Sequence, residues 1–116
     1  MQKFDYRAPR FAVDFPVKLK MLSSLHIARC RDISEDGMRL ELGDPFPPES
    51  CGEVSFSYQE LSLDLYVRVT HAGVGCDGLK FLYESDEQRA KMLLLMSRLA
   101  TPHPVASLFL VTQQLY

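Results

Sequence analysis

The sequence predicts a mainly β domain, a six-stranded antiparallel barrel followed by a C-terminal helix, with room for a second helix. Three observations favour this fold class. Several short segments alternate apolar and polar residues, as strands with one buried face do. Turn-forming residues separate these segments every ~8–12 residues, which is typical of a barrel or a sandwich. The apolar period then changes from two to helical spacing after Ser85.

The first two strands are expected on either side of a short turn. Every second residue of Phe11–Leu19 is apolar, which predicts one buried face. Pro16 lies on the opposite face, where a missing N–H is tolerated only near an edge or a bulge. A turn is expected at Ser23–Ser24, and a second strand with weaker alternation covers Leu25–Arg31.

A polar turn and a third strand follow. Asp32–Asp36 has turn composition, Gly37 ends it, and Met38–Leu42 alternates again. Residues 43–50 carry three prolines and are expected to form a loop, because proline cannot donate to a sheet ladder.

The last three strands complete the expected barrel over residues 11–83. Val54–Tyr58 and Leu61–Val69 alternate on either side of Gln59–Glu60, which predicts a hairpin. The Leu61–Val69 run is interpreted as core. Gly73–Gly78 is expected to be a turn, and Leu79–Tyr83 a short final strand.

The C-terminal part is helical in pattern. Ser85-Asp-Glu-Gln88 is a capping box, in which the serine caps a helix amide and the glutamine reaches back. A helix is expected over residues 86–100, with Met92 and Met96 as packing residues and a core face of Ala90, Leu93, Leu94 and Leu99. Residues 105–116 predict a second short helix, which either closes the barrel or offers a partner surface.

Composition excludes several classes of function. The 116 residues suit one domain, and the formal net charge of −2 argues against DNA or RNA as a partner, because phosphate neutralisation needs a basic excess. A few local arginines can still hold a small anion. The three cysteines form no C-x-x-C pair, so we expect neither a disulfide framework nor a zinc site. The beginning of the sequence has no apolar signal core, and no apolar run approaches the ~18 residues of a membrane helix. A cytoplasmic location without membrane insertion is therefore expected.

Enzymatic chemistry has no support in the sequence. His26, His71 and His103 lack metal-ligand spacing, and His26 and His71 are interpreted as structural. There is no recognisable acid–base pair, nucleophile triad or glycine-rich phosphate loop. We expect no catalytic residues, no metal and no cofactor.

Two polar clusters are candidates for a ligand site. The first is Tyr6-Arg7-Ala8-Pro9-Arg10, before the first strand. Guanidinium groups bind phosphate oxygens in bidentate fashion and stack on bases, although these arginines can equally be ordinary solvated charges. The second cluster is Asp32-Ile-Ser34-Glu-Asp-Gly37. Its carboxylate can accept two N–H groups from a guanine edge, and the bland alternative is a turn joining two strands.

The two clusters are expected at the same barrel end, because one strand, one turn and a second strand separate Arg10 from Asp32. Here the chain resembles the PilZ family, whose members carry R-x-x-x-R before the first strand and [D/N]-x-S-x-x-G between strands two and three. The resemblance extends from Tyr6 to Ala100 and includes Gly78-Leu-Lys-Phe81 and the helix start.

The resemblance implies a receptor for cyclic di-GMP, often bound as an intercalated pair. It assigns Arg10 to phosphate contact and guanine stacking, Asp32 and Ser34 to the guanine edge, and Gly37 to the turn. It also implies a protein partner that carries the response, because the chain leaves little room for an output domain.

One departure from the family pattern matters. Tyr6 stands where the first motif arginine is expected. Either Arg7 replaces it and Tyr6 stacks on a base, or the chain is a PilZ-like adaptor of pilus, motility or secretion machinery that does not bind the nucleotide.

Overall fold

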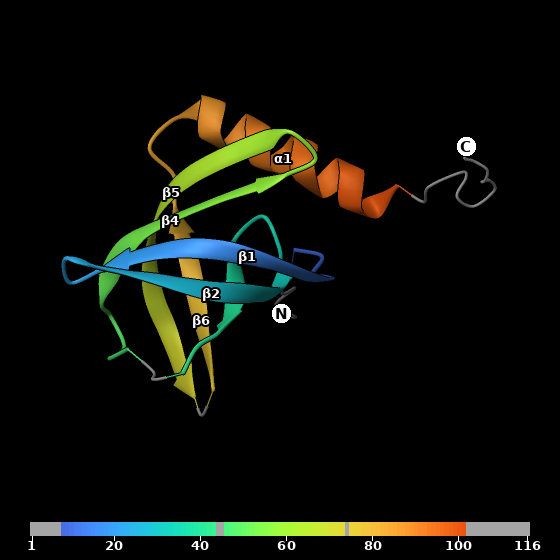
Figure 1. Cartoon of the computed structure of the whole chain (residues 1–116). Helices are drawn as coiled ribbons and strands as arrows, with labels where there is room; N and C mark the ends of the chain where they lie inside the picture. Colours follow the sequence, from blue (N-terminus) through green and yellow to red (C-terminus); the bar gives the residue numbers. More distant parts are fainter. Residues whose placement is uncertain (1–7, 44–45, 74, 102–116) are drawn as a thin grey trace, which may run out of the picture.

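The structure, a computed structural model, describes residues 8–43, 46–73 and 75–101 of the chain. Its strands are β1 (Phe11–Met21), β2 (Ser24–Ile33), β3 (Gly37–Glu41), β4 (Cys51–Tyr58), β5 (Leu61–Gly73) and β6 (Cys76–Leu82), and its helix is α1 (Asp86–Ala100). The strands close into an antiparallel barrel in the order β1-β2-β3-β6-β5-β4, with α1 lying over the barrel beside β5 (Figure 1). The predicted six-stranded barrel with a C-terminal helix is confirmed.

The core lies inside the barrel, where the alternating strands direct their apolar side chains. Burying each of these side chains contributes roughly 1.5–3 kcal/mol, and together they offset the entropy lost on folding. The predicted core run of β5 is buried from its second apolar position onward. On β1, β4 and β5 the buried inward-facing residues are Phe15, Val17, Leu19 and Met21, then Val54 and Phe56, and then Leu63, Leu65, Val67 and Val69.

Two hairpins have two-residue turns in the left-handed conformation, which matches the twist of the flanking strands. Gln59 and Glu60 have φ of 48° and 70°, as the predicted hairpin requires. The first turn is formed by Leu22 and Ser23, with φ of 51° and 67°, and not by Ser23–Ser24. The expectation was one residue late because β1 continues to Met21, which is buried and pairs with Ser24.

The turn predicted over residues 73–78 is wrong at its C-terminal boundary, because the structure ends it earlier. Strand β6 begins at Cys76, so Gly78 lies inside the sheet, opposite Arg39 of β3 and His71 of β5. Glycine and aspartate are poor strand formers, but pairing with a strand on each side overrides local propensity.

Helix α1 begins as its sequence indicates. The Ser85 hydroxyl accepts a hydrogen bond from the Gln88 amide at 3.2 Å. The Gln88 side chain accepts from the backbone N–H of Glu84 at 2.7 Å, one residue before the cap, and donates to the Asp64 carbonyl of β5 at 3.0 Å. The capping box therefore also fixes the helix to the barrel.

The buried face of α1 differs from the predicted one. Met92 is fully buried and Met96 partly buried, as predicted, and Leu95 is also fully buried, whereas Leu93 and Leu94 are 47% and 46% exposed and Ala90 is exposed. Leu99 is partly buried, as expected. The rotation follows from hydrogen bonds to β5 and to the β4–β5 turn, which are made by Gln88, Lys91 and Arg98.

The predicted second helix over 105–116 and most of the N-terminal segment 1–10 lie outside the described residues. Within the part of the chain that is described, no helix is long and apolar enough to cross a bilayer.

Candidate ligand-binding site

Asp32, near the end of β2, is the centre of the candidate site. Its carboxylate forms ion pairs with the guanidinium groups of Arg10 and Arg39, the latter with Nε at 2.9 Å from Oδ2. Asp32 is 17% exposed at its side chain, and both arginines are 52% exposed. The arrangement is a carboxylate held by two cations whose outer faces remain open to solvent.

Local irregularity of the sheet places these side chains together. Asp32 pairs with Ala12 of β1 and Arg39 of β3, and both ladders shift register nearby, between Ala12 and Phe15 and between Cys30 and Asp32. Such bulges bend a strand and redirect its side chains. The expectation that Arg10 and Asp32 share one end of the barrel is borne out by their direct contact.

Hydrogen bonds between its own residues stabilise the turn after Asp32. Ser34 is buried, with 2% exposure, and its hydroxyl accepts a hydrogen bond from the Asp36 amide at 3.1 Å. The Ser34 amide donates to the Gly37 carbonyl at 2.8 Å. In this structure the Ser34 hydroxyl supports the turn and does not face an open surface.

Gly37 is required by close approach of two strands. A Cβ added there would collide with the backbone carbonyl of Leu79 on β6. Beside it, the Phe81 amide of β6 donates to the Asp36 carbonyl at 2.8 Å. Gly37 therefore lets β6 support the turn directly.

The same turn is connected to α1 through Glu35. The Tyr83 hydroxyl donates to the Glu35 carbonyl, and Arg89 of α1 lies 3.5 Å from the Glu35 carboxylate. The Arg89 guanidinium also lies 4.4 Å from the centre of the Tyr83 ring, a cation–π contact. Burial raises the pKa of Tyr83 above its ordinary value, so its hydroxyl stays protonated and donates.

A shallow groove runs beside this cluster. It encloses about 320 Å³ and lies between the entrance of β1, the turn and α1. Its walls are formed by Pro9, Phe11, Glu35, Leu93, Met96, Ser97 and Ala100. Arg10, Asp32 and Arg39 do not line this groove, and Pro9 and Phe11 project to the other side of the extended chain from Arg10.

Of the residues predicted from sequence, Arg10, Asp32, Ser34 and Gly37 lie at or beside this cluster. Tyr6 and Arg7 lie outside the described residues. Arg39 was missed, because its contact with Asp32 depends on the register between β2 and β3. The sequence did give one indication of Arg39, because it is the charged residue between two apolar positions in the strand that follows the Asp32–Gly37 motif.

His26 is a packing residue in the structure. The His26 ring packs edge-on against Phe46, with centroids 5.1 Å apart, which fits the structural role predicted for it. Within residues 8–43, 46–73 and 75–101, no cluster of three histidine, cysteine or carboxylate side chains could hold a metal ion.

The fold and the site together define a small β-barrel domain with an arginine–aspartate cluster at one end. The model of the PilZ domain matches residues 5–98, and the chain therefore belongs to the PilZ family. No curated protein matches it.

Solved structures share the barrel. The PilZ domain of CeSA from a cellulose-synthesizing bacterium aligns with a TM-score of 0.71 and 17% identity, over 81% of this chain and 100% of that one. The uncharacterized Legionella protein Lpg0364 aligns with a TM-score of 0.59 and 18% identity, over 78% of this chain and 91% of that one. At these identities the likeness concerns the fold alone.

Proposed function

We propose that this chain is a cyclic di-GMP receptor without catalytic activity, and that it signals through a protein partner. The PilZ family is a family of cyclic di-GMP receptors, and its members act as ligand-binding or adaptor domains and not as enzymes. The observation that carries the proposal is the cluster of Arg10 and Arg39 around the Asp32 carboxylate, at the mouth of the Ser34–Gly37 turn.

The chemistry of this cluster suits a cyclic dinucleotide. Guanidinium groups pair with phosphate oxygens and stack on purine rings, and a carboxylate accepts the N–H groups of a guanine edge. Ser34 and Gly37 keep the carboxylate in place through the turn. Arg7 and Tyr6 are proposed to add a third cation and a stacking surface from the preceding segment.

Binding requires an exchange of partners. Arg10 is paired with Asp32, and an ion pair with a half-exposed arginine contributes only about 0–1 kcal/mol. Arg10 can therefore leave Asp32 at little cost and pair with a ligand phosphate, which frees Oδ1 of the carboxylate for guanine while Arg39 holds Oδ2.

Calorimetric titration with cyclic di-GMP tests the proposal. Wild type is expected to bind, and Arg10→Ala and Asp32→Ala are expected to lose at least tenfold in affinity, equivalent to ~1.4 kcal/mol. Arg29→Ala is the matched control, because Arg29 also pairs with an aspartate, Asp14 at 2.6 Å, further along the same strands. Undetectable binding by wild type, or equal losses in all three variants, contradicts the proposal.

A second candidate is an adaptor that does not bind the nucleotide. It is favoured by Tyr6 at the position of the first motif arginine and by the engagement of both Asp32 oxygens by the chain's own arginines. This candidate predicts a partner complex that Arg10→Ala retains and that cyclic di-GMP does not change in a pull-down.

A further inference from the structure

One side of α1 borders the groove near the candidate site and is not used to pack on the barrel. Four residues of α1 line this groove, and they are Leu93, Met96, Ser97 and Ala100. They are spaced at i, i+3, i+4 and i+7, so they form one continuous stripe along the helix, which we call the α1 stripe. It is separate from the face that packs on the barrel, where Met92 and Leu95 are fully buried.

The opposite wall of the groove is apolar as well. Pro9 and Phe11 belong to this wall, and Phe11 is only partly buried. Among the described residues that line the groove, Glu35 is the only charged one, and its carboxylate lies 3.5 Å from the Arg89 guanidinium. The groove therefore favours an apolar and uncharged occupant, because a charged side chain gains no partner there to offset its loss of water.

The chain itself carries such a segment directly after α1. Residues 102–116 contain no Asp, Glu, Lys or Arg. Within residues 105–116 the apolar positions Val105, Leu108, Phe109 and Leu115 recur at helical spacing, which predicts an amphipathic helix. An uncharged segment with several large apolar residues is typical of a chain that packs on protein, since solvated tails are rich in charge.

The connection between α1 and this segment has a suitable length. α1 ends at Ala100, which lines the groove, and Thr101 has an extended backbone with φ of −87° and ψ of 120°. Residues 101–104 fit the connection of about 2–5 residues that joins two antiparallel helices. A helix over residues 105–116 is about 18 Å long, whereas the α1 stripe spans about 11 Å, so one helix can cover the stripe.

We propose that residues 105–116 form a helix that packs antiparallel to α1 over this groove, with its apolar face on the α1 stripe and Phe11. A helix with its side chains is about 10–12 Å wide, so a groove of about 320 Å³ takes its side chains and not its backbone. The groove is bounded by Pro9 and Phe11 and by Glu35 of the turn after Asp32. The docked helix therefore lies directly behind the candidate site and connects α1, the turn and the entrance of β1.

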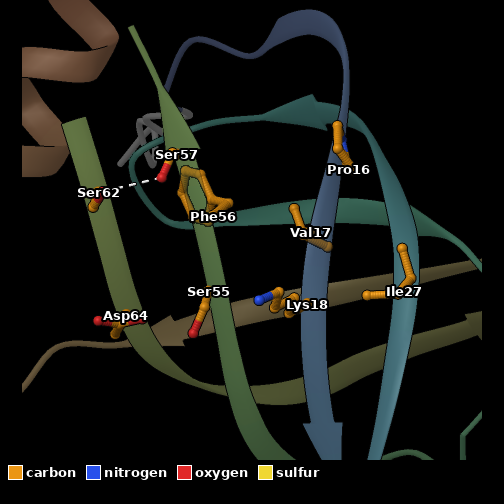
Figure 2. Close-up of a pocket in the computed structure, with 9 residues that line it drawn as sticks. All are labelled: Pro16, Val17, Lys18, Ile27, Ser55, Phe56, Ser57, Ser62 and Asp64. Atoms are coloured by element: carbon orange, nitrogen blue, oxygen red, sulfur yellow. Dashed lines mark hydrogen bonds between the residues drawn. The ribbon is translucent and has the colours of Figure 1, made fainter. Parts of the chain in front are cut away.

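Two other pairings within the chain fit less well. Residues 1–7 include Lys3, Asp5 and Arg7, so the preceding segment is a poorer match for an apolar groove. Figure 2 shows Lys18, Asp64 and three serines among the residues that line the larger cleft between β1 and β4, which encloses about 500 Å³. An uncharged apolar segment placed in that cleft would leave these polar groups without partners.

Hydrogen exchange of a peptide covering residues 105–116, measured on the nucleotide-free protein, tests the proposal. In wild type these amides are expected to exchange at least tenfold more slowly than in a free synthetic peptide of the same sequence. Leu93→Asp is expected to abolish this protection. Leu94→Asp is the matched control and is expected to retain the protection, because Leu94 is 46% exposed, like Leu93 at 47%, but does not line the groove.

A substitution in the segment itself gives a second test. Phe109→Asp is expected to abolish the protection as Leu93→Asp does, and it leaves every described residue unchanged. Wild-type exchange rates at the amides of β5 show that each variant is folded. Because no nucleotide is present, a failure of cyclic di-GMP binding does not alter any of these results.

Several outcomes overturn the proposal. These are wild-type exchange at the rate of the free peptide, protection that Leu93→Asp leaves intact, and equal loss of protection in Leu93→Asp and Leu94→Asp. Protection that appears only at high protein concentration assigns the segment to a second copy of this chain. Protection that appears only with phosphatidylglycerol vesicles assigns it to a membrane surface, and either result also excludes the contact within one chain.

Discussion

Cys30 is buried on β2, two residues before Asp32, and its thiol donates to the Asp32 carbonyl at 3.3 Å. Burial, and secondarily the charge of Asp32, raises the pKa of Cys30 from 9.0 to about 12. The unfolded thiol therefore ionises first as the pH rises. The stabilisation that Cys30 provides is complete below pH 9 and is lost between pH 9 and about 12, at roughly 1.4 kcal/mol per pH unit.

Urea denaturation across this pH range measures the effect. Cys30→Ala is expected to show a shallower fall in the free energy of unfolding above pH 9 than wild type. Cys51→Ala removes an exposed thiol and is expected to keep the wild-type slope. Identical slopes for wild type and Cys30→Ala would contradict this account. The same burial makes the Cys30 thiol unreactive beside the candidate site.

Residues of the candidate site differ in how far sequence could locate them. Asp32, Ser34 and Gly37 lie within one turn, so a local pattern identified them together. Arg39 contacts Asp32 only because β2 and β3 pair across a register shift, which no local pattern encodes. The buried, turn-supporting position of Ser34 depends equally on tertiary packing.

At the scale of elements, sequence located α1 well and its orientation poorly. The capping residues and the change of period are local signals, and the helix begins and ends where they indicate. Its rotation is set by long polar side chains that reach carbonyl groups of the barrel, such as Arg98 to Gln59 at 2.6 Å. Leu93 and Leu94, which the sequence pattern placed in the core, are exposed for that reason.

The contact between α1 and the Asp32–Gly37 turn predicts a coupling that can be measured. Arg89→Ala removes an ion pair with Glu35 and a cation–π contact with Tyr83, together worth about 0.5–1.5 kcal/mol. We expect faster hydrogen exchange at the amides of the turn, because α1 no longer restrains Glu35. Exchange mass spectrometry of a peptide covering residues 34–37 measures it.

Arg98→Ala is the control for this experiment. Arg98 attaches the same helix to the β4–β5 turn, so its removal is expected to affect residues 59–60 and leave the Asp32–Gly37 turn protected. Equal exchange of the two turns in both variants would mean that the helix acts on the barrel as a whole and that Arg89 has no specific connection to the site.

At the scale of the whole molecule, closure of the barrel depends on the short ladder between β1 and β4, which we call the seam. β1 pairs with β2 over nearly its full length but with β4 only from Lys18 to Met21. Pro16 lies outside this ladder, consistent with the expectation that it occupies an edge position. Sequence patterns predicted the six strands, but where the first and fourth strands stop pairing follows from closure of the barrel around its core.

Gly52 lies in this seam, opposite Met21 of β1, and a Cβ there would collide with the Met21 side chain and the Lys20 carbonyl. We expect Gly52→Ala to destabilise the protein by about 1–3 kcal/mol, the usual cost of overpacking. The amides of Lys18–Met21 are expected to exchange faster while those between β2 and β3 change less, because the seam opens before the rest of the sheet.

Gly43→Ala is the control for this experiment. It adds a Cβ with no atom within 4 Å and is expected to change stability by less than ~0.5 kcal/mol. If Gly52→Ala accelerated exchange uniformly over all six strands, the barrel would open only by global unfolding, and the seam would not be its weakest part.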